Sequence, residues 1–399
     1  MITLEKVKHA AEVLGEVARR TDLIYSPDMS VENQIYLKTE NLQVTGSFKL
    51  RGAYYKISQL SEEEKQRGIV ACSAGNHAQG VALASQKNNL PCVICMPDGA
   101  PISKVEATKS YGAEVCLVKD TYDDAYAKAM QIVAEEGRTL IHPFDDPDVI
   151  AGQGTIGLEI LEQLEDVDAI IVPVGGGGLL SGVAYAVKAI NPNIKVYGVQ
   201  AAGAPSMYNS IKAGEKQSLT SVSTFADGIA VKVPGDNTYS MISKYVDDMA
   251  VVSEDEIAAA ILTMMEKQKI VAEGAGAVSV AAALYNKFDL HGKKVVCVVS
   301  GGNIDVNILN RVITRGLIMS GRRDSLTITL VDKPGQLHKA LEIVSRCGAN
   351  ILEVHHNSSD PNMPINSCYV KIDMETRDKA QVELIKEEFT KAGFELITK

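Results

Sequence analysis

The sequence has no run of Lys and Arg residues, and its formal net charge is −10. Nucleic acids and anionic membranes bind positively charged surfaces, so this charge argues against both kinds of partner. No apolar stretch is long and uncharged enough to span a bilayer, and residues 1–21 have the spacing of an amphipathic helix rather than a secretory signal. Internal repeats and low-complexity tracts are also missing. We therefore expect a globular protein that acts on small molecules.

A disulfide framework is also lacking, because the seven cysteines are odd in number and scattered along the chain. They resemble reduced, buried thiols, which makes the cytoplasm the expected compartment. With 399 residues, of which 46% are hydrophobic and 23% charged, the chain is long enough to form two or three structural units.

Between Ile69 and Val299 short β-branched runs alternate with helical stretches. This alternation predicts an α/β fold with parallel strands covered by helices. Several runs end directly in glycine-rich turns, which places the glycines at the carboxyl ends of strands. Open α/β sheets bind ligands at that edge, so we expect the functional residues on these turns.

After Arg322 the pattern changes to the order β-α-β-β-α-β, which is typical of a ferredoxin-like unit with its own core. Pro334 stands at the expected start of the first helix of this unit, and Gly348 stands where that helix should end.

Lys49 lies in the segment TGSFKLRGA, where its neighbours Phe48 and Leu50 are apolar. A lysine becomes a nucleophile when burial or a nearby cation lowers its pKa, and the apolar neighbours or Arg51 could supply either effect. A surface lysine on an ordinary helix is the alternative, and this segment alone does not decide between them.

Two glycine-rich turns are candidate anion sites. In ACSAGNHAQG a strand ends at Ser73 and turns through Gly75 into a helix, whose first N–H groups can hold a carboxylate. Asn76 adds a side chain that can donate to a phenolate-like oxygen. In IVPVGGGGLLSG a strand leads into Gly175–Gly178, and four residues without side chains let main-chain N–H groups surround a phosphate. A polar helix cap and a flexible linker are the respective alternatives.

A third strand, in VVCVVSGGN, ends at Ser300. If the ligand carries a pyridine ring, a serine hydroxyl that faces the ring nitrogen donates a hydrogen bond to it without protonating it. Such a ring is a weaker electron acceptor, which favours elimination of a β-substituent over transamination. A simple β-turn is the alternative.

Three other patterns are set aside. GQGTIG at 152–157 matches a dinucleotide-binding fingerprint but follows no apolar strand, so we interpret it as a helix start. Cys92 and Cys95 lie in one predicted strand, where residues three apart point to opposite faces. His355 and His356 have no cysteine or carboxylate set around them at ligand spacing in the sequence, so we do not expect a metal site there.

Taken in this order, SFKLRGA, SAGNHAQG, GGGGL and SGGN resemble the fold-type II enzymes that depend on pyridoxal phosphate, and specifically the threonine dehydratase (threonine ammonia-lyase) branch. The resemblance covers about residues 5–320. It implies two open-sheet α/β domains of the tryptophan synthase β-like architecture. It also implies conversion of L-threonine to 2-oxobutanoate and ammonia, and of L-serine to pyruvate.

The resemblance further implies roles for individual residues. It makes Lys49 the residue that carries the cofactor as a Schiff base and removes the α-proton. The implied catalytic residues are Lys49, Ser73 and Glu273. The implied cofactor-binding residues are Phe48, Lys49, Asn76, Gly175, Gly176, Gly177, Gly178, Leu179 and Ser300. The residues implied to hold the substrate carboxylate are Ser73, Ala74, Gly75, Asn76 and His77.

From about Ser325 the chain resembles an ACT domain, including the DKPGQL turn that often borders an amino-acid site. ACT domains act in pairs, so the resemblance implies a homodimer or homotetramer and an amino-acid or nucleotide effector. A dimerisation module without a ligand is the alternative. The expected domains are a catalytic part at 1–320, with a small subdomain at about 52–146, a linker at 321–325 and the ACT domain at 326–399.

Two departures separate the chain from the related serine racemases. Racemases use a serine as the acid and base on the opposite face of the substrate, where this chain has Ala74, so racemisation should be poor. They also bind a divalent ion through acidic residues where this chain has Gln200 and Ser206. We therefore expect no divalent metal, whereas a monovalent ion stays open. Racemisation, another β-elimination or replacement reaction, and a catalytically silent amino-acid sensor are the alternatives.

Overall fold

The computed structural model describes residues 2–359 and 363–397. The chain forms two compact units, Met1–Asp305 and Val306–Lys399, and each has hydrophobic core clusters of its own. Helix α13 (Val306–Met319) therefore belongs to the C-terminal unit, although we expected it in the catalytic part. None of the helices in the described ranges combines the length and apolar character that crossing a bilayer requires.

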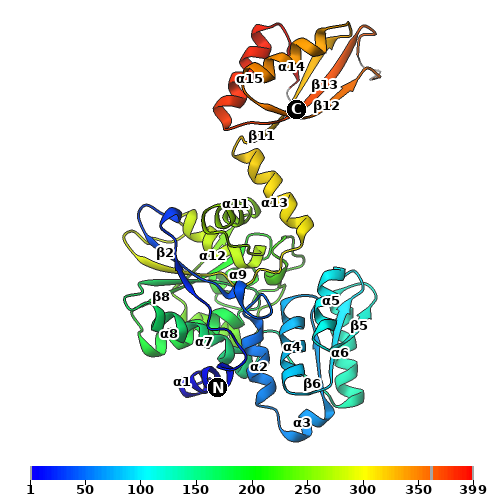
Figure 1. Cartoon of the computed structure of the whole chain (residues 1–399). Coiled ribbons are helices and arrows are strands. Elements are labelled where there is room, and N and C mark those ends of the chain that lie inside the picture. Colours follow the sequence, from blue (N-terminus) through cyan, green and yellow to red (C-terminus); the bar gives the residue numbers. More distant parts are fainter. Residues whose placement is uncertain (1, 360–362, 398–399) are drawn as a thin grey trace. The chain divides into compact units, whose positions relative to one another are not determined.

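A six-stranded sheet forms the centre of the N-terminal unit. Its strands are β1 (Leu23–Tyr25), β2 (Gln34–Lys38), β7 (Ala169–Pro173), β8 (Lys195–Ala201), β9 (Asp248–Val252) and β10 (Lys294–Val298). Their order is β1-β2-β10-β7-β8-β9, and all neighbours are parallel except β1 and β2. Every residue of β7 is buried, because α8 (Gly178–Ile190) and α12 (Gly274–Leu284) lie on opposite faces of the sheet (Figure 1).

The remaining helical segments of this part of the chain surround the sheet, and α7 (Pro147–Gln163) among them packs closely on α8. They are α1 (Leu4–Leu14), α7 (Pro147–Gln163), α9 (Ser206–Ala213), α10 (Asp236–Tyr245), α11 (Glu254–Thr263), a π-helix at Met264–Gln268, and 3-10 turns η1 (Pro27–Met29), η2 (Glu40–Leu42) and η3 (Asp227–Ile229). The side chain of Asp146 caps α7. The segment GQGTIG therefore lies inside a helix and not at its start. Its glycines allow contact with α8, where a Cβ on Gly182 would lie 2.3 Å from the Ile150 carbonyl oxygen.

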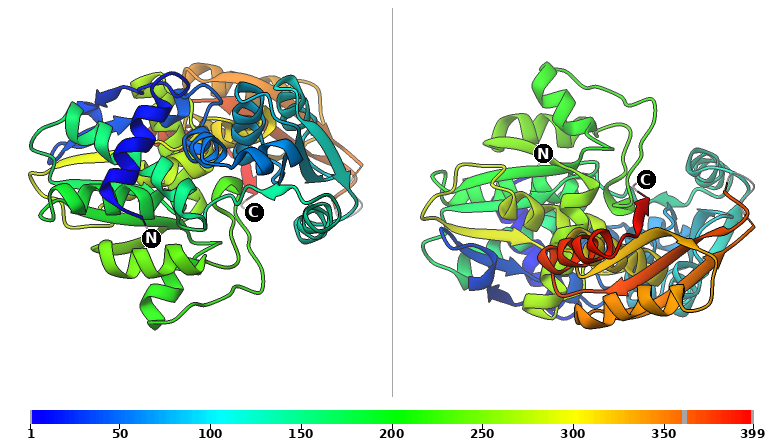
Figure 2. Two further views of the ribbon diagram at one scale, coloured as in Figure 1. Left: turned by 90° about the horizontal axis from the view of Figure 1, so that it is seen from below. Right: turned by 90° about the horizontal axis from the view of Figure 1, so that it is seen from above.

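A smaller sheet is built entirely from parallel strands and lies beside the large one (Figure 2). Its strands are β3 (Ile69–Cys72), β4 (Cys92–Pro97), β5 (Glu114–Val118) and β6 (Thr139–Leu140), in the order β5-β4-β3-β6. The nearby helices are α2 (Lys49–Ser58), α3 (Glu62–Arg67), α4 (Asn76–Lys87), α5 (Ile102–Ser110) and α6 (Tyr122–Glu136). The two open α/β sheets are those predicted. Cys92 and Cys95 both lie in β4, and all seven cysteines are free thiols.

The C-terminal unit has the predicted β-α-β-β-α-β order. After α13, its elements are β11 (Arg323–Val331), α14 (Gln336–Arg346), β12 (Asn350–Asn357), β13 (Ser367–Glu375), α15 (Lys379–Lys391) and β14 (Glu395–Ile397). The strands form an antiparallel sheet in the order β12-β13-β11-β14. Gly348, just beyond α14, has φ +77°, the left-handed conformation that commonly ends a helix.

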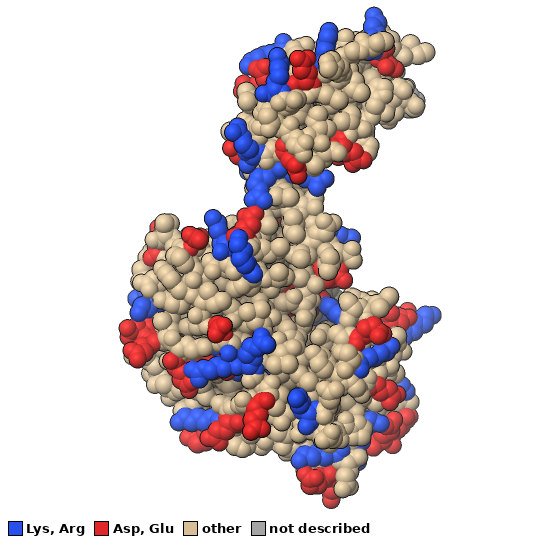
Figure 3. Space-filling model, in the orientation of Figure 1, with Lys and Arg blue, Asp and Glu red and all other residues tan. Residues whose placement is uncertain are grey.

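Charged side chains of both signs are mixed on the surface that Figure 3 shows, where Lys and Arg lie among Asp and Glu.

Candidate active site

The residues singled out in the sequence gather at the carboxyl ends of the strands. Ser73 directly follows β3, Gly175 comes shortly after β7, and Ser300 shortly after β10. Lys49 is the first residue of α2, and the Phe48 N–H donates to the Ser300 carbonyl oxygen over 3.1 Å. The two sheets therefore present their ligand-binding edges to the same place, as expected for open α/β sheets.

The amine of Lys49 points toward the segment that follows β6. Its Nζ donates to the Pro143 carbonyl oxygen over 2.7 Å. Burial lowers the pKa of Lys49 from 10.5 to about 8, against the opposing effect of the Glu273 charge. The next residue, Phe144, packs on the glycine turn, because a Cβ on Gly176 would lie 2.4 Å from its ring. The segment 143–144 thus brings the amine and the four glycines together.

Arg51 does not supply the cation that we considered for Lys49. Its guanidinium is 1% exposed and pairs with Glu40 over 2.8 Å and with Glu159 over 2.6 Å. Lys38 joins the same group through a 2.5 Å contact with Glu159. Burial, not Arg51, is what lowers the pKa of Lys49. The four charges instead fix the first turn of α2 against α7 and β2.

The four glycines form a turn in which side chains have no room. Gly177 has φ +100°, and a Cβ there would lie 2.8 Å from Thr238. A Cβ on Gly178 would lie 2.9 Å from the Phe144 carbonyl oxygen. No side chain caps the start of α8, and Leu179 in its first turn is buried. The turn therefore exposes main chain and the positive end of a helix, which is an arrangement that binds phosphate.

The start of α4 is a second uncapped helix end. Gly75 precedes this helix, and no atom lies within 4 Å of the position a Cβ would take there, so its main chain faces open space. The Gly75 N–H donates to Ser73 Oγ over 3.2 Å, and Ala74 between them is half-buried. Main-chain N–H groups at this helix start are suited to a carboxylate.

The ring of His77 is turned away from this opening. It is 3% exposed, and its Nε2 donates to the Ile141 carbonyl oxygen over 2.8 Å. Burial, with the nearby Lys49 charge, lowers its pKa to about 3, so the ring is neutral. Of the predicted carboxylate-binding residues, His77 can therefore offer a ligand only its main-chain N–H.

Asn76, Glu273 and Asn303 form a hydrogen-bonded chain beside the opening. Asn76 Nδ2 donates to Glu273 Oε1 over 2.6 Å, and Asn303 Nδ2 donates to Asn76 Oδ1 over 2.8 Å. Burial, with the Asp227 charge, raises the pKa of Glu273 to about 7. Asn303 is the last residue of the SGGN motif, but sequence reasoning gave it no role. Its contact fixes the orientation of the Asn76 amide and leaves that group one more N–H to donate.

Ser300 and Phe48 complete the surroundings of Lys49. Ser300 is 2% exposed, and its Oγ lies 3.4 Å from the Ala275 carbonyl oxygen, at the limit of a hydrogen bond. The ring centre of Phe48 lies 5.4 Å from Lys49 Nζ, and the ring packs against the core cluster that contains Leu179.

An ion pair next to this site connects helix α5 with turn η3. Lys104 of α5 contacts Asp227 of η3 with a Nζ to Oδ2 distance of 2.5 Å. The Asp227 charge raises the pKa of Glu273 and the Lys104 charge lowers it, so both lie close to that carboxyl group. No sequence signal identified this pair, because its partners are distant in the chain and lie in different structural elements.

The side chains at the positions of the racemase metal ligands are engaged in hydrogen bonds. Gln200 Oε1 accepts from the Tyr208 N–H over 2.7 Å, and Ser206 Oγ donates to the Val231 carbonyl oxygen over 2.7 Å. Both side chains thus fix main chain around α9.

The site has the features that pyridoxal phosphate needs. Lys49 provides a buried amine with a pKa of about 8. The turn Gly175–Gly178 is closed to side chains and leads into an uncapped helix. Ser300 provides a buried hydroxyl next to the Phe48–Lys49 segment, and Asn76 provides an amide with one N–H to spare. The residues present therefore fit an aldehyde cofactor with a phosphate group.

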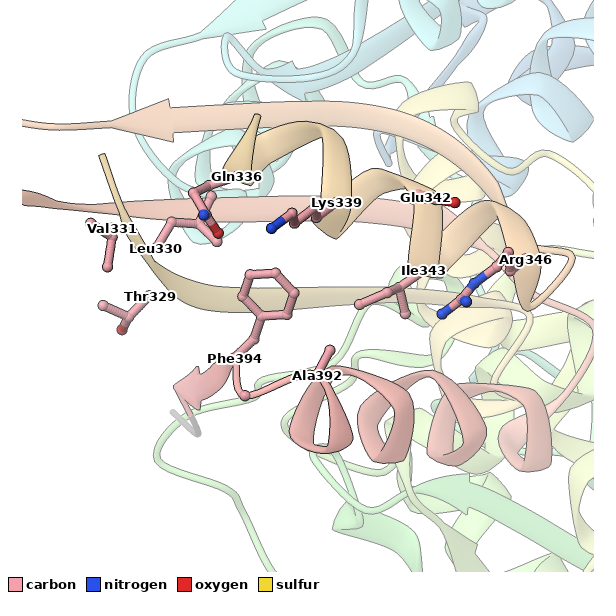
Figure 4. Close-up of a pocket in the computed structure, with 11 residues that line it drawn as sticks. Thr329, Leu330, Val331, Gln336, Lys339, Glu342, Ile343, Arg346, Ala392 and Phe394 are labelled. Carbon is pink, nitrogen blue, oxygen red and sulfur yellow. The ribbon is translucent and has the colours of Figure 1, made fainter. Parts of the chain in front are cut away.

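The C-terminal unit contains a separate pocket of about 310 Å³. Lys339, Glu342 and Arg346 project from α14 on one side, and the ring of Phe394 points toward that helix (Figure 4). The complete lining is Thr329, Leu330, Val331, Gln336, Lys339, Glu342, Ile343, Arg346, Ala392, Gly393 and Phe394. Charged groups above an apolar floor suit a small polar ligand.

Known proteins with similar sequences and structures cover most of the chain. The L-threonine ammonia-lyase of Thermotoga maritima is 52% identical over 398 residues, which are 99% of each chain. Threonine deaminase isoform 2 of Solanum lycopersicum, in its processed form, superposes with a TM-score of 0.73 at 40% identity, over 78% of this chain and 88% of that one. Maize serine racemase gives a TM-score of 0.74 at 36% identity, over 80% and 98%.

The sequence pattern described as "Pyridoxal-phosphate dependent enzyme" matches residues 15–301. This range contains Lys49, the glycine turn and Ser300, the groups whose arrangement fits the cofactor. The chain therefore belongs to the family of pyridoxal-phosphate dependent enzymes.

Proposed function

We propose that this enzyme is an L-threonine ammonia-lyase, which converts L-threonine to 2-oxobutanoate and ammonia and also converts L-serine to pyruvate. The observation that carries the proposal is the place of the Lys49 amine, between the glycine turn and the open start of α4. The full-length relative of that name, at 52% identity, supports the choice of substrate.

The residues around Lys49 have distinct roles in the proposed reaction. The main chain of Gly175–Gly178 and the start of α8 would hold the phosphate, and Ser300 and Asn76 would donate hydrogen bonds to the ring. When bound, pyridoxal phosphate supplies an aldehyde for the substrate amine and a ring that accepts electrons from the α-carbon. The main chain of Ser73–His77 holds the substrate carboxylate. The Lys49 amine then accepts the α-proton, which its pKa of about 8 allows near neutral pH.

Elimination is favoured over racemisation because of Ala74. A racemase needs a second group that delivers a proton to the opposite face of the α-carbon, and a methyl group cannot do so. Maize serine racemase shares the fold, so the product must be identified and not only the loss of substrate. A D-amino acid as the main product would contradict the proposal.

The substitution Lys49→Ala tests the assignment directly. We expect release of ammonia and 2-oxobutanoate from L-threonine to fall by at least about 10²-fold, because both the attachment point and the base are lost. The visible absorbance of the lysine-bound cofactor should also vanish. The matched control is Lys87→Ala, at an exposed position in the last turn of α4, which should retain both signals. Retained oxo-acid formation in Lys49→Ala would refute the proposal.

We further propose that the C-terminal unit is an ACT domain that regulates the enzyme by binding an amino-acid or nucleotide effector. Its strand order and its pocket support this role, because Val331 and Gln336 of the pocket flank the DKPG turn. Lys339 and Arg346 offer positive charge to a carboxylate or phosphate, and Phe394 offers an apolar surface. We also propose a homodimer or homotetramer, which light scattering would test.

Steady-state ammonia release from threonine, with and without isoleucine, valine or nucleoside monophosphates, tests the regulation. One of these compounds should change the activity of the parent enzyme, and the double variant Lys339→Gln/Arg346→Gln should lose that response. Lys386→Gln, on the surface of α15, is the control and should keep the response. An effector response that survives in the double variant would place the binding site elsewhere.

A further inference from the structure

The two adjacent histidines of β12 gain partners through the fold that the sequence did not indicate. His356 lies close to Cys368 of β13 and to Asp332, which directly follows β11. One ligand atom from each of these three side chains lies within 4.8 Å of the others. Thiol, imidazole and carboxylate groups thus converge from three segments that are neighbours in the sheet.

The distances between these ligand atoms can be compared with the lengths of metal–ligand bonds. His356 Nε2 lies 3.0 Å from Cys368 Sγ and 4.0 Å from Asp332 Oδ1. Zinc bonds measure about 2.3 Å to sulfur and about 2.0–2.2 Å to nitrogen and oxygen. The nitrogen–sulfur separation is shorter than the sum of two such bonds, and the nitrogen–oxygen separation is close to that sum. One ion can therefore reach these atoms after rotations of the half-exposed His356 and Asp332 side chains.

The exposure of the three groups leaves an open side. Cys368 is 1% exposed, whereas the side chains of His356 and Asp332 are 41% and 49% exposed. An ion held here would rest on a buried sulfur and face solvent on the other side, where water can complete a tetrahedral set.

A second group of potential metal ligands differs from the first in its surroundings. Glu353, His355 and Asp373 also bring one ligand atom each within 4.8 Å of the others. There, Lys371 already pairs with Asp373 over 3.2 Å, and no thiol is among the three side chains. A protein cation thus satisfies part of that negative charge, so we assign no ion to it.

We propose that Asp332, His356 and Cys368 form a binding site for a transition-metal ion of the Zn²⁺ class, which would connect β11, β12 and β13. Thiolate and imidazole ligands favour such ions over Mg²⁺ and Ca²⁺, which prefer oxygen ligands. This site is independent of the catalytic assignment, because all three residues belong to the C-terminal unit.

Zinc binding to the full-length holoenzyme tests the proposal. The protein is first treated with a chelator and then brought to equilibrium with Zn²⁺ by dialysis. We expect one more zinc ion per chain than in the double variant His356→Gln/Cys368→Ser. Zinc affinity at this site should fall by at least about tenfold in His356→Gln and in Asp332→Asn, because each removes one ligand. X-ray absorption at the zinc edge should show one sulfur ligand, which Cys368→Ser removes.

Two control variants show whether the zinc ion is bound by these three side chains. His355→Gln alters the neighbouring histidine and should leave the zinc affinity unchanged, as should Cys347→Ser at the end of α14. Cys368 is buried, so its variant could unfold, and in that case the variants at the half-exposed His356 and Asp332 decide the outcome. Unchanged zinc binding in His356→Gln, loss in His355→Gln, or a zinc spectrum without sulfur would each overturn the proposal.

Discussion

Glu273 is a buried carboxyl group whose pKa of about 7 lies well above its ordinary value of 4.5. As the pH rises from about 4.5 to 7, the unfolded chain loses this proton before the folded chain does, so the carboxyl group makes the fold progressively less stable. Glutamine at this position carries no such penalty and can still accept the hydrogen bond from Asn76. The charge of Glu273 is therefore a cost to stability above neutral pH.

We predict that the melting temperature of Glu273→Gln, relative to the parent, increases between about pH 5 and pH 8. Differential scanning fluorimetry of the holoenzyme at both pH values measures this difference. Glu12→Gln, at an exposed position of α1, is the control and should show no such trend. A difference that is equal at both pH values would mean that Glu273 does not titrate in this range.

At the scale of residues, the sequence identified the groups that gather at the strand ends better than the partners of those groups. Lys49, the glycine turn and Ser300 each lie in a local motif with its own chemical reason. The contacts Asn76–Glu273 and Lys104–Asp227 join residues 197 and 123 positions apart, so no local pattern indicates them. Arg51 was considered as a neighbour of Lys49, but residues two positions apart on a helix point in different directions.

The contact between α7 and α8 depends on glycine at several positions. A Cβ on Gly182 would lie 2.3 Å from the Ile150 carbonyl oxygen, and main chain in a helix cannot move aside easily. We predict that Gly182→Ala destabilises the enzyme by about 1–3 kcal/mol, which a denaturant titration would detect. Gly99→Ala is the control, since no atom lies within 4 Å of its added carbon. Equal stability of both variants would show that the helices can separate without cost.

The pair Lys104–Asp227 joins α5 to η3 across the site. Ion pairs with an exposed partner contribute about 0–1 kcal/mol, and Asp227 is 60% exposed. We predict that Lys104→Ala raises KM for threonine by up to about fivefold with a smaller change in kcat, because the pair joins α5 to η3 beside Glu273. Lys109→Ala, on the same helix, should leave KM unchanged. A lower kcat at constant KM would instead place Lys104 in the chemical step.

At the scale of elements, strands were predictable where both faces are buried. The apolar runs of β3, β4, β7 and β10 were recognised from their β-branched residues, and β3, β7 and β10 also lead into glycine-rich turns. Strand β2 was not recognised, because its sequence QIYLK ends in a lysine that the fold buries against Glu159. Strand β6 has only two residues, too few for any periodicity.

At the scale of the whole molecule, the two units have separate cores. The core cluster around Leu326, Ile372 and Phe389 consists entirely of residues from the C-terminal unit. We predict that a fragment of residues 306–399 folds by itself and unfolds cooperatively in urea, with an m-value of about 1–3 kcal/mol/M. Circular dichroism measures this transition. A gradual loss of signal without a midpoint would show that this core needs the rest of the chain.

The buried charges of Lys38, Glu40, Arg51 and Glu159 restrict how the sequence can evolve. Removal of Arg51 leaves the fully buried Glu40 without its ion-pair partner, and breaking a buried pair in this way typically costs about 3–5 kcal/mol. Exchange of all four for apolar groups can be neutral, but every intermediate on that path is penalised. We therefore expect these four positions to change together or not at all during evolution. Because Arg51 anchors the first turn of α2, the same charges also determine where Lys49 lies.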